Sequence, residues 1–228
     1  MTPLKDRLVD AALAHVPFDG WTEATFRHAI EDAGVTPAQG RAACPRGALD
    51  LALAFHDRDD ARMVERLQTA DVGDMRFRDR IAHAVRLRLE IAEENKEAVR
   101  RGLTLFSLPM HAPDGLRAMW RTVDAIWDTL GDTSEDVNWY TKRGTLSGVY
   151  SATVLYWLGD SSEDYRDTWA FLDRRIDEVM QIEKVKARVK SSPILSRMMA
   201  GPEMILGRIR APSRSSRNTM PGMWRDPS

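Results

Sequence analysis

The stretch from Asp136 to Trp157 constrains the fold most, because it is long, free of proline and patterned as a single helix. At 3.6 residues per turn, one side of that helix carries aromatic and charged residues. The members of this stripe are Asp136, Trp139, Tyr140, Arg143, Ser147, Tyr150, Val154 and Trp157. We interpret Tyr150 and Trp157 as core residues. We expect Trp139, Tyr140 and Arg143 instead to form a contact surface, because aromatic residues and arginine dominate interface hot spots.

The opposite side of the same helix carries small residues. Small side chains either let a neighbouring helix approach closely or leave room for a long, thin ligand. We therefore predict a ligand-binding stripe along this side, made of Gly144, Gly148, Ala152 and Leu155.

The rest of the chain also favours an all-α fold. Helical spacing of apolar residues recurs along most of the 228 residues, whereas the alternation typical of strands is scarce. No apolar run approaches the roughly 18 residues of a spanning helix. The single Cys44 excludes an intrachain disulfide and fits a reducing compartment. The amphipathic, acid-containing N-terminus resembles neither a secretory signal nor a transit peptide, so we predict a cytosolic location.

The net charge of −1 conceals an asymmetry. Residues 184–228 hold ten Lys/Arg and two acidic residues, a net charge of +8, so the remainder carries −9. A basic tail on an acidic body indicates an anionic partner, either lipid headgroups or nucleic acid.

The first quarter of the chain contains a helix-turn-helix pattern. LVDAALAHV is followed by DGWTEATFRHAIEDAGVTPAQG, a proline break and ALDLALAF. This order resembles the DNA-binding domain of TetR-type repressors. Its recognition helix, however, offers only Gln39 and Arg41 for bases or phosphates. We predict that the scaffold is kept and that DNA reading is lost, so nucleic acid is not an expected partner.

The segment after Ser192 has the pattern of an amphipathic helix that lies on a membrane surface. Arg197 and Arg208 are expected to meet lipid headgroups, and the alternative is a helix packed back on the core. The apolar arc consists of Ile194, Leu195, Met198, Met199, Ile205, Leu206 and Ile209.

These patterns predict four parts. They are a degenerate helix-turn-helix domain (1–58), a helical lipid-binding and dimerisation domain (59–190), an amphipathic membrane-binding helix (191–210) and a disordered basic tail (211–228).

Two strings, DVNWYTKR and DTWAFLDRRI, carry a second and more specific resemblance. From about Leu4 to Met180 the chain resembles the ubiquinone (coenzyme Q) biosynthesis protein nine family, lipid-binding proteins with a TetR-like fold. The resemblance implies a homodimer that binds an isoprenoid quinone lipid and docks on the membrane. It also implies presentation of the lipid to the di-iron demethoxyubiquinone hydroxylase. The family's patch for that enzyme falls on Asp136, Trp139, Tyr140 and Arg143.

Mitochondrial members of that family begin with a transit peptide. Its absence here favours a bacterial protein, located in the cytoplasm and peripheral to the inner face of the cytoplasmic membrane.

The sequence offers no convincing catalytic motif. None of its five His residues completes a Glu-x-x-His pair, and neither a phosphate loop nor GxSxG is present. His28 with Glu31 and Asp32 is the nearest polar cluster, and we interpret it as a surface feature. We therefore expect no enzyme activity, no metal and no cofactor other than bound lipid.

Three hypotheses remain open. The leading one is the lipid-binding accessory protein, because burial of a prenyl tail supplies affinity without polar chemistry. The alternatives are a TetR-type ligand-responsive transcriptional regulator and a dimeric scaffold without a ligand.

Overall fold

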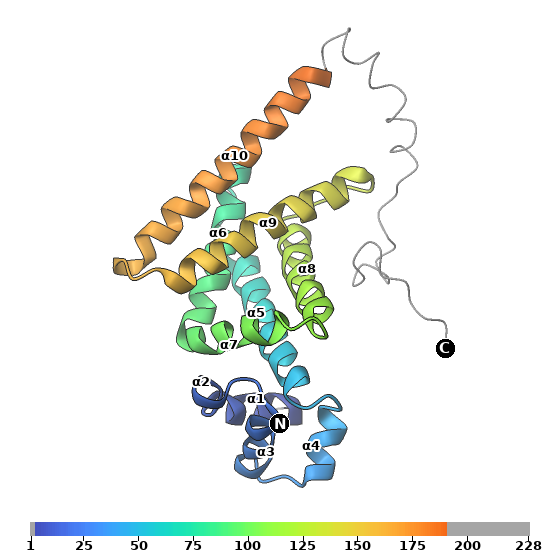
Figure 1. The fold of residues 1–228 in the computed structure, drawn as a ribbon. Helices are drawn as coiled ribbons and strands as arrows, with labels where there is room; N and C mark the ends of the chain where they lie inside the picture. The colour runs from blue at the N-terminus through green and yellow to red at the C-terminus, as the bar shows by residue number, and fades with distance from the viewer. Residues whose placement is uncertain (1–2, 191–228) are drawn as a thin grey trace. The chain divides into compact units, whose positions relative to one another are not determined.

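The computed structural model describes residues 3–190, with side chains up to Gln181 (Figure 1). This part of the chain contains helices and no strand, which confirms the all-α prediction. The elements in chain order are α1 (Leu4–Leu13), α2 (Val16–Asp19), α3 (Glu23–Asp32), α4 (Pro37–Ala43), α5 (Ala48–Thr69), α6 (Phe77–Ala92), the 3-10 turn η1 (Glu93–Asn95), α7 (Lys96–Phe106), α8 (Ala112–Thr129), α9 (Val137–Gly159), η2 (Glu163–Tyr165) and α10 (Arg166–Lys190).

The chain forms two compact units. The first contains residues up to Ala70 together with Leu87–Thr122, and the second contains Asp71–Arg86 and the residues from Val123 onward. These two units are defined by contacts within the chain. The predicted boundary at residue 58 instead separates a degenerate helix-turn-helix domain from a lipid-binding and dimerisation domain, and it stays a prediction. The predicted membrane helix (191–210) and basic tail (211–228) lie outside the described residues.

The first unit contains the predicted helix-turn-helix. Thr22 caps α3, its side chain accepting from the backbone N–H of Thr25. Gly34 then turns the chain at a φ of +64°, a conformation that favours glycine. Thr36 begins α4 with a capping box, in which Thr36 and Gln39 each bond the other's backbone N–H. Local capping chemistry thus sets the position of both helices.

The core of the first unit forms where α1 and α3 pack on the first half of α5. Its buried apolar side chains include Leu8, Val16, Trp21, Phe26, Leu51 and Phe55. The indole Nε1–H of Trp21 donates to the carbonyl oxygen of Ala98 across 3.0 Å. This bond ties the turn before α3 to α7, within the same unit.

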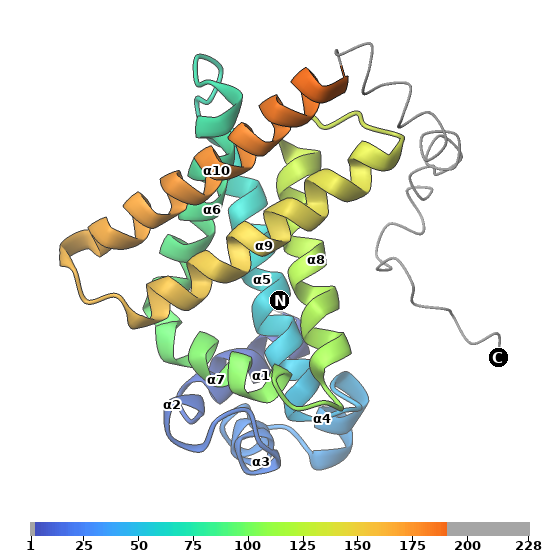
Figure 2. The same ribbon diagram turned by 45° about the horizontal axis from the view of Figure 1, so that its top comes forward.

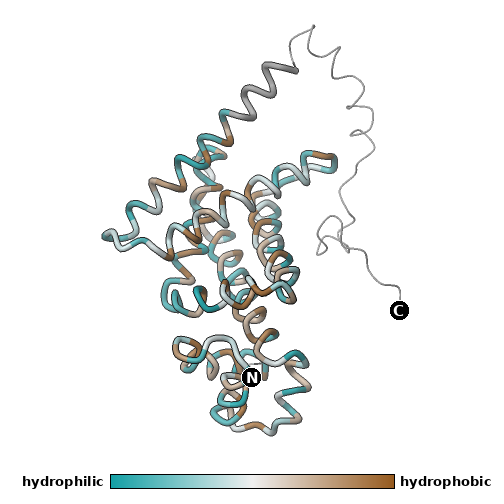
Figure 3. Tube along the Cα trace, viewed as in Figure 1, coloured by the Kyte–Doolittle hydropathy of each residue, from teal (hydrophilic) through white to brown (hydrophobic). Residues whose placement is uncertain are grey.

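The second unit contains the two longest helices, α9 and α10, which lie side by side in both views (Figures 1 and 2). The hydropathy colour alternates along α10, the pattern of a helix with one apolar face (Figure 3). Leu172 and Ile176 on that face are buried. Tyr150 and Trp157 of α9 are 6% and 1% exposed, which confirms their assignment to the core.

Three helix boundaries depend on more than local sequence signals. Pro17 lies in the first turn of α2, where its missing N–H costs nothing. Helix α5 continues past Asp57, and its Asp59 and Asp60 are buried against Arg88. The 3-10 turn η1 separates α6 from α7, since Asn95 leaves the helical region (φ −124°, ψ 37°).

Over residues 3–190, no helix combines the length and the apolar composition needed to cross a bilayer.

Candidate functional site

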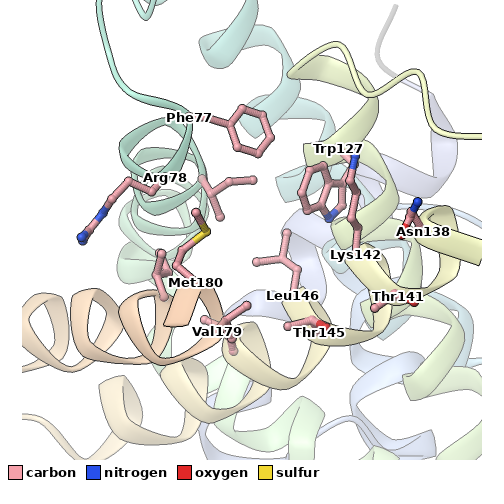
Figure 4. Close-up of a pocket in the computed structure, with 13 residues that line it drawn as sticks. Phe77, Arg78, Trp127, Asn138, Thr141, Lys142, Thr145, Leu146, Val179 and Met180 are labelled. Carbon is pink, nitrogen blue, oxygen red and sulfur yellow. The ribbon is translucent and has the colours of Figure 1, made fainter. Parts of the chain in front are cut away.

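A cavity of about 280 Å³ opens among four helices of the second unit (Figure 4). The helices that line it are α6, α8, α9 and α10. This volume lies near the lower limit of small-molecule sites, which span about 300–1,000 Å³. The cavity therefore suits a ring and a short stretch of attached chain. The described lining residues are Phe77, Arg78, Ile81, Trp127, Asn138, Thr141, Lys142, Thr145, Leu146, Val149, Ile176, Val179 and Met180.

The cavity has a polar side and an apolar side. The polar side consists of Asn138, Thr141, Lys142 and Thr145 in the first turns of α9, whereas Val179 and Met180 approach from α10 (Figure 4). A pocket of this kind binds a molecule that is apolar over most of its length and carries a few polar atoms at one end.

Lys142 is held in place at the polar side. Its ammonium donates to Oδ1 of Asp132 across 2.8 Å and to Oγ of Ser134 across 2.7 Å, and it lies 5.2 Å from the ring centre of Trp127. Because these contacts fix the ammonium, a polar ligand atom would meet an oriented cation rather than a flexible one.

The described lining residues include no His, Cys, Asp or Glu. They offer hydrogen bonds, the paired ammonium of Lys142 and the paired guanidinium of Arg78, but no carboxylate–imidazole pair for proton transfer and no typical metal ligands.

Sequence reasoning missed this pocket, because it belongs to no single motif. Ile176, Val179 and Met180 of α10 meet residues of α6 and α9 only in the folded chain. The signal that could have found it is the set of apolar helix faces, each with one or two polar residues at one end.

Part of the predicted contact surface at the start of α9 lies beneath the surface of the chain. Trp139 is 1% exposed and Arg143 is fully buried in this structure. The guanidinium of Arg143 lies 4.1 Å from the ring centre of Trp139. It also bonds Asp124, Asp128 at 3.1 Å and Asp132 at 2.9 Å. A buried arginine needs such partners, and three carboxylates explain why Arg143 points inward.

Asp132 is the carboxylate shared by Arg143 and Lys142. Burial alone would raise the pKa of Asp132, but the hydrogen bonds from Lys142, Arg143 and Ser134 outweigh it and lower the pKa to about 2. The carboxylate is thus fixed in its charged form, which holds the loop after α8 against α9.

The other two members of the predicted surface are accessible. Asp136 is exposed and caps α9, its side chain accepting from the backbone N–H of Asn138. Tyr140 is half-buried and packs edge-on against Trp139, with ring centres 4.8 Å apart. Partner binding at Asp136 and Tyr140 therefore stays a prediction, with Trp139 and Arg143 as the layer beneath them.

The predicted small-residue stripe lies outside the pocket. Gly144 and Gly148 are exposed, and a Cβ on either would meet no atom within 4 Å in the described chain. Ala152 is half-buried and Leu155 is 64% exposed. The pocket is lined by the adjacent face of α9, through Thr141, Thr145 and others. Ligand binding along the small-residue stripe therefore stays a prediction separate from this pocket. The stripe faces outward from the unit.

In the helix-turn-helix, both side chains offered for DNA contacts have partners within the protein. Oε1 of Gln39 accepts from the backbone N–H of Thr36 across 2.9 Å. Arg41 pairs with Glu23 and lies 4.7 Å from the ring centre of Phe26. Partners within the protein thus occupy the side-chain oxygen of Gln39, which accepts, and the guanidinium of Arg41, which donates.

The fold and the pocket together define a class: an all-α chain of the TetR-like fold with a binding cavity among its C-terminal helices. The crystal structure of a TetR transcriptional regulator from Nitrosomonas europaea is similar, with a TM-score of 0.64 over 77% of this chain and 97% of that chain. At 22% identity, this similarity defines the fold alone.

The chain belongs to the COQ9 family. The sequence model of that family matches residues 112–183, which contain α8 and α9. Over 82% of this chain, the mitochondrial ubiquinone biosynthesis protein COQ9 of Drosophila melanogaster is 34% identical. The COQ9-B protein of Xenopus laevis, also mitochondrial, is 30% identical over 83% of this chain. The chain spans 58% of the length of the first relative and 67% of the second.

Proposed function

We propose that the protein is a lipid-binding accessory factor of ubiquinone biosynthesis and not an enzyme. The proposal is carried by the pocket: a largely apolar cavity with one polar side, in a chain whose relatives are named for ubiquinone biosynthesis. A quinone precursor has the matching distribution, with oxygen atoms on its ring and an isoprenoid tail.

In this proposal, the ring oxygens lie near Lys142, Asn138 and Thr145, and the first part of the tail lies against Ile81, Ile176 and Met180. Because the cavity is small, the rest of the tail extends outside it. Each Å² of apolar surface that the tail buries contributes about 25 cal/mol, so the apolar side supplies most of the affinity.

The same proposal places Asp136 and Tyr140 at a surface for the di-iron hydroxylase that uses the lipid. This surface and the pocket share α9, since Asn138 and Thr141 of the pocket are neighbours of Asp136 and Tyr140 in the chain. A lipid bound at the polar side would therefore lie close to the docked enzyme. The segment 191–210 would hold the protein at the inner face of the cytoplasmic membrane of a bacterium.

Lipid extraction and mass spectrometry of the purified native protein test lipid binding. We expect a prenylated quinone precursor in the bound fraction, which Val179→Trp removes by filling the apolar side of the cavity. Arg174→Trp introduces the same ring at an exposed position of α10 and is expected to leave the lipid bound. A protein that carries no lipid, or a Val179→Trp variant that retains it, would contradict the proposal.

The alternative of a ligand-responsive regulator is supported only by the fold shared with the TetR regulator. The internal bonds of Gln39 and Arg41 argue against it. A mobility-shift assay on upstream DNA at low and physiological salt separates the two, because sequence-selective binding that weakens with salt would favour the regulator.

A further inference from the structure

Two His–Asp pairs with the same spacing meet in the first unit. His15 is the N-cap residue of α2 and Asp19, four positions later, is its last residue. His28 and Asp32 are four residues apart on α3. Side chains four apart on a helix lie on the same face. Since α2 packs on α3, the two pairs face each other.

The distances between these side chains are short. Donor atoms of His15, Asp19 and His28 all lie within 4.8 Å of one another. Nε2 of His15 lies 2.7 Å from Oδ2 of Asp32, and Nδ1 of His28 lies 3.8 Å from Oδ2 of Asp19. The two imidazole rings are 4.8 Å apart between centres.

Nδ1 of His28 is the atom that the packing leaves unexplained. It is buried, yet within the described part of the chain no donor or acceptor lies at hydrogen-bonding distance from it. A buried polar atom without a partner is costly, and a bound ion is one of the ordinary explanations.

We propose that His15, Asp19 and His28 bind a divalent transition-metal ion of the zinc type, with Asp32 as the positioning residue for His15. Two imidazoles and one carboxylate are a common donor set for such an ion, with bonds of about 2.0–2.2 Å. Ligand atoms around a tetrahedral ion are then about 3.3 Å apart, so the side chains need to move inward by at most about 1.5 Å.

The required movement is small for these side chains. His15, Asp19 and His28 are 29%, 44% and 45% exposed, so each has room to change rotamer without displacing the core. The contact of Asp32 with one ring nitrogen of His15 fixes the orientation of that ring, as second-sphere carboxylates do at metal sites.

The proposed ion is a clip and not a catalytic centre. It would join α2 to α3 across the turn at Gly20, whose φ is +68°, and so stabilise the first unit. An ion that binds only the folded chain raises its stability in proportion to the logarithm of its concentration. This site is independent of the lipid pocket, whose lining residues belong to the second unit.

Equilibrium dialysis and calorimetry with Zn²⁺, on tag-free full-length protein stripped with chelator, test the proposal. We expect one Zn²⁺ per chain with a Kd of roughly 10 µM or below. His28→Ala and Asp19→Asn should each abolish this binding. Asp32→Asn should weaken it by about 10-fold while leaving the stoichiometry unchanged. Zn²⁺ should also raise the unfolding temperature of the wild type but not that of His28→Ala.

His83→Ala and His111→Ala are the matched controls, because they remove a histidine elsewhere and should bind Zn²⁺ as the wild type does. Circular dichroism of each variant confirms that the helices are intact. Absence of Zn²⁺ binding below about 100 µM, or binding that survives both His28→Ala and Asp19→Asn, would overturn the proposal.

Discussion

Nη1 of Arg143 donates to Oδ2 of Asp132 across 2.9 Å, and the same carboxylate holds Lys142 through its other oxygen at 2.8 Å. Asp132 thus connects the buried Arg143, near the start of α9, to Lys142, which lines the pocket. The stability of the helix and the chemistry of the pocket depend on one shared group.

Substitution of Arg143 by Met should destabilise the protein strongly. The change leaves Asp124 and Asp132 in the interior without their cation, and breaking a buried pair of this kind costs about 3–5 kcal/mol. Urea unfolding measures the loss. Arg174→Met removes an exposed arginine and should change the free energy of unfolding by less than about 0.5 kcal/mol. An equal loss of unfolding free energy in the two variants would show that the buried ion pairs of Arg143 stabilise the protein no more than an exposed arginine does.

Asp132 should also produce a pH dependence. Its pKa is about 2 in the folded protein and 3.8 ordinarily, so folding favours the charged carboxylate. The resulting stabilisation, about 2 kcal/mol, is complete above pH 4 and is lost as the pH falls towards 2. The difference in unfolding free energy between wild type and Asp132→Asn should therefore shrink over this window. A constant difference from pH 5 to pH 2 would contradict the assignment.

The burial of Trp139 and Arg143 shows what the sequence could not supply. The stripe of aromatic and charged residues was identified correctly, but its orientation depended on Asp124, Asp128 and Asp132. These carboxylates come from α8 and the loop after it, and nothing in the helix 136–157 itself indicates that they converge on one guanidinium. A helix projection gives the residues that share a face, but not the element that covers it.

Substitutions of Tyr140 and Trp139 should distinguish an effect on partner binding from an effect on stability. Tyr140→Ala removes a half-buried ring and should weaken hydroxylase association while changing the unfolding free energy by about 1 kcal/mol. Trp139→Ala empties a buried site and should destabilise the fold by about 3–5 kcal/mol. Pull-down with the hydroxylase, alongside urea unfolding, gives both values. Retained association in Tyr140→Ala and in Asp136→Ala would rule out this surface.

Thr145→Val should reveal the polar side of the pocket. The change keeps the shape and removes one hydroxyl, so a quinone whose oxygen lies there should bind up to about 10-fold more weakly. A ring-free prenyl alcohol, held by its tail, should bind as before. Thr104→Val makes the same change on α7, outside the pocket, and should alter neither affinity. Fluorescence titration with the quinone and with the prenyl alcohol measures both affinities. An equal loss of affinity for the two ligands would show that the quinone ring does not lie at Thr145.

The small-residue stripe of α9, which faces outward from the second unit, is the expected homodimer surface. Gly144, Gly148 and Leu155 lie exposed with nothing over the two glycines in the described chain, and Tyr156 stacks on Phe171 at 4.6 Å beside them. Leu155→Asp should shift the protein from dimer to monomer in light scattering, because a charge at an apolar interface core is strongly unfavourable. Asp173→Ala, an exposed change on α10, should leave the dimer intact. A wild-type monomer would exclude this use of the stripe.

Capping chemistry made the helix-turn-helix predictable. Thr22, Gly34 and Thr36 each act within a few residues of their own position, so the turn residues could be identified without tertiary information. The pocket and the His–Asp pairs could not, since each depends on helices that are distant in the chain. His28 was assigned to the surface from its neighbours on α3, because its approach to His15 requires the packing of α2 on α3.

The pocket draws its walls from α6, α8, α9 and α10, which are separated by up to about a hundred residues in the chain. A molecule that fills it therefore ties these helices to one another. The rate at which the amides of α10 exchange with solvent should fall when the pocket is full and rise when its contents leave. Helix α9 carries the proposed partner surface and should show the same change. A partner bound there would then respond to pocket occupancy through the rigidity of α9, without any movement of the backbone.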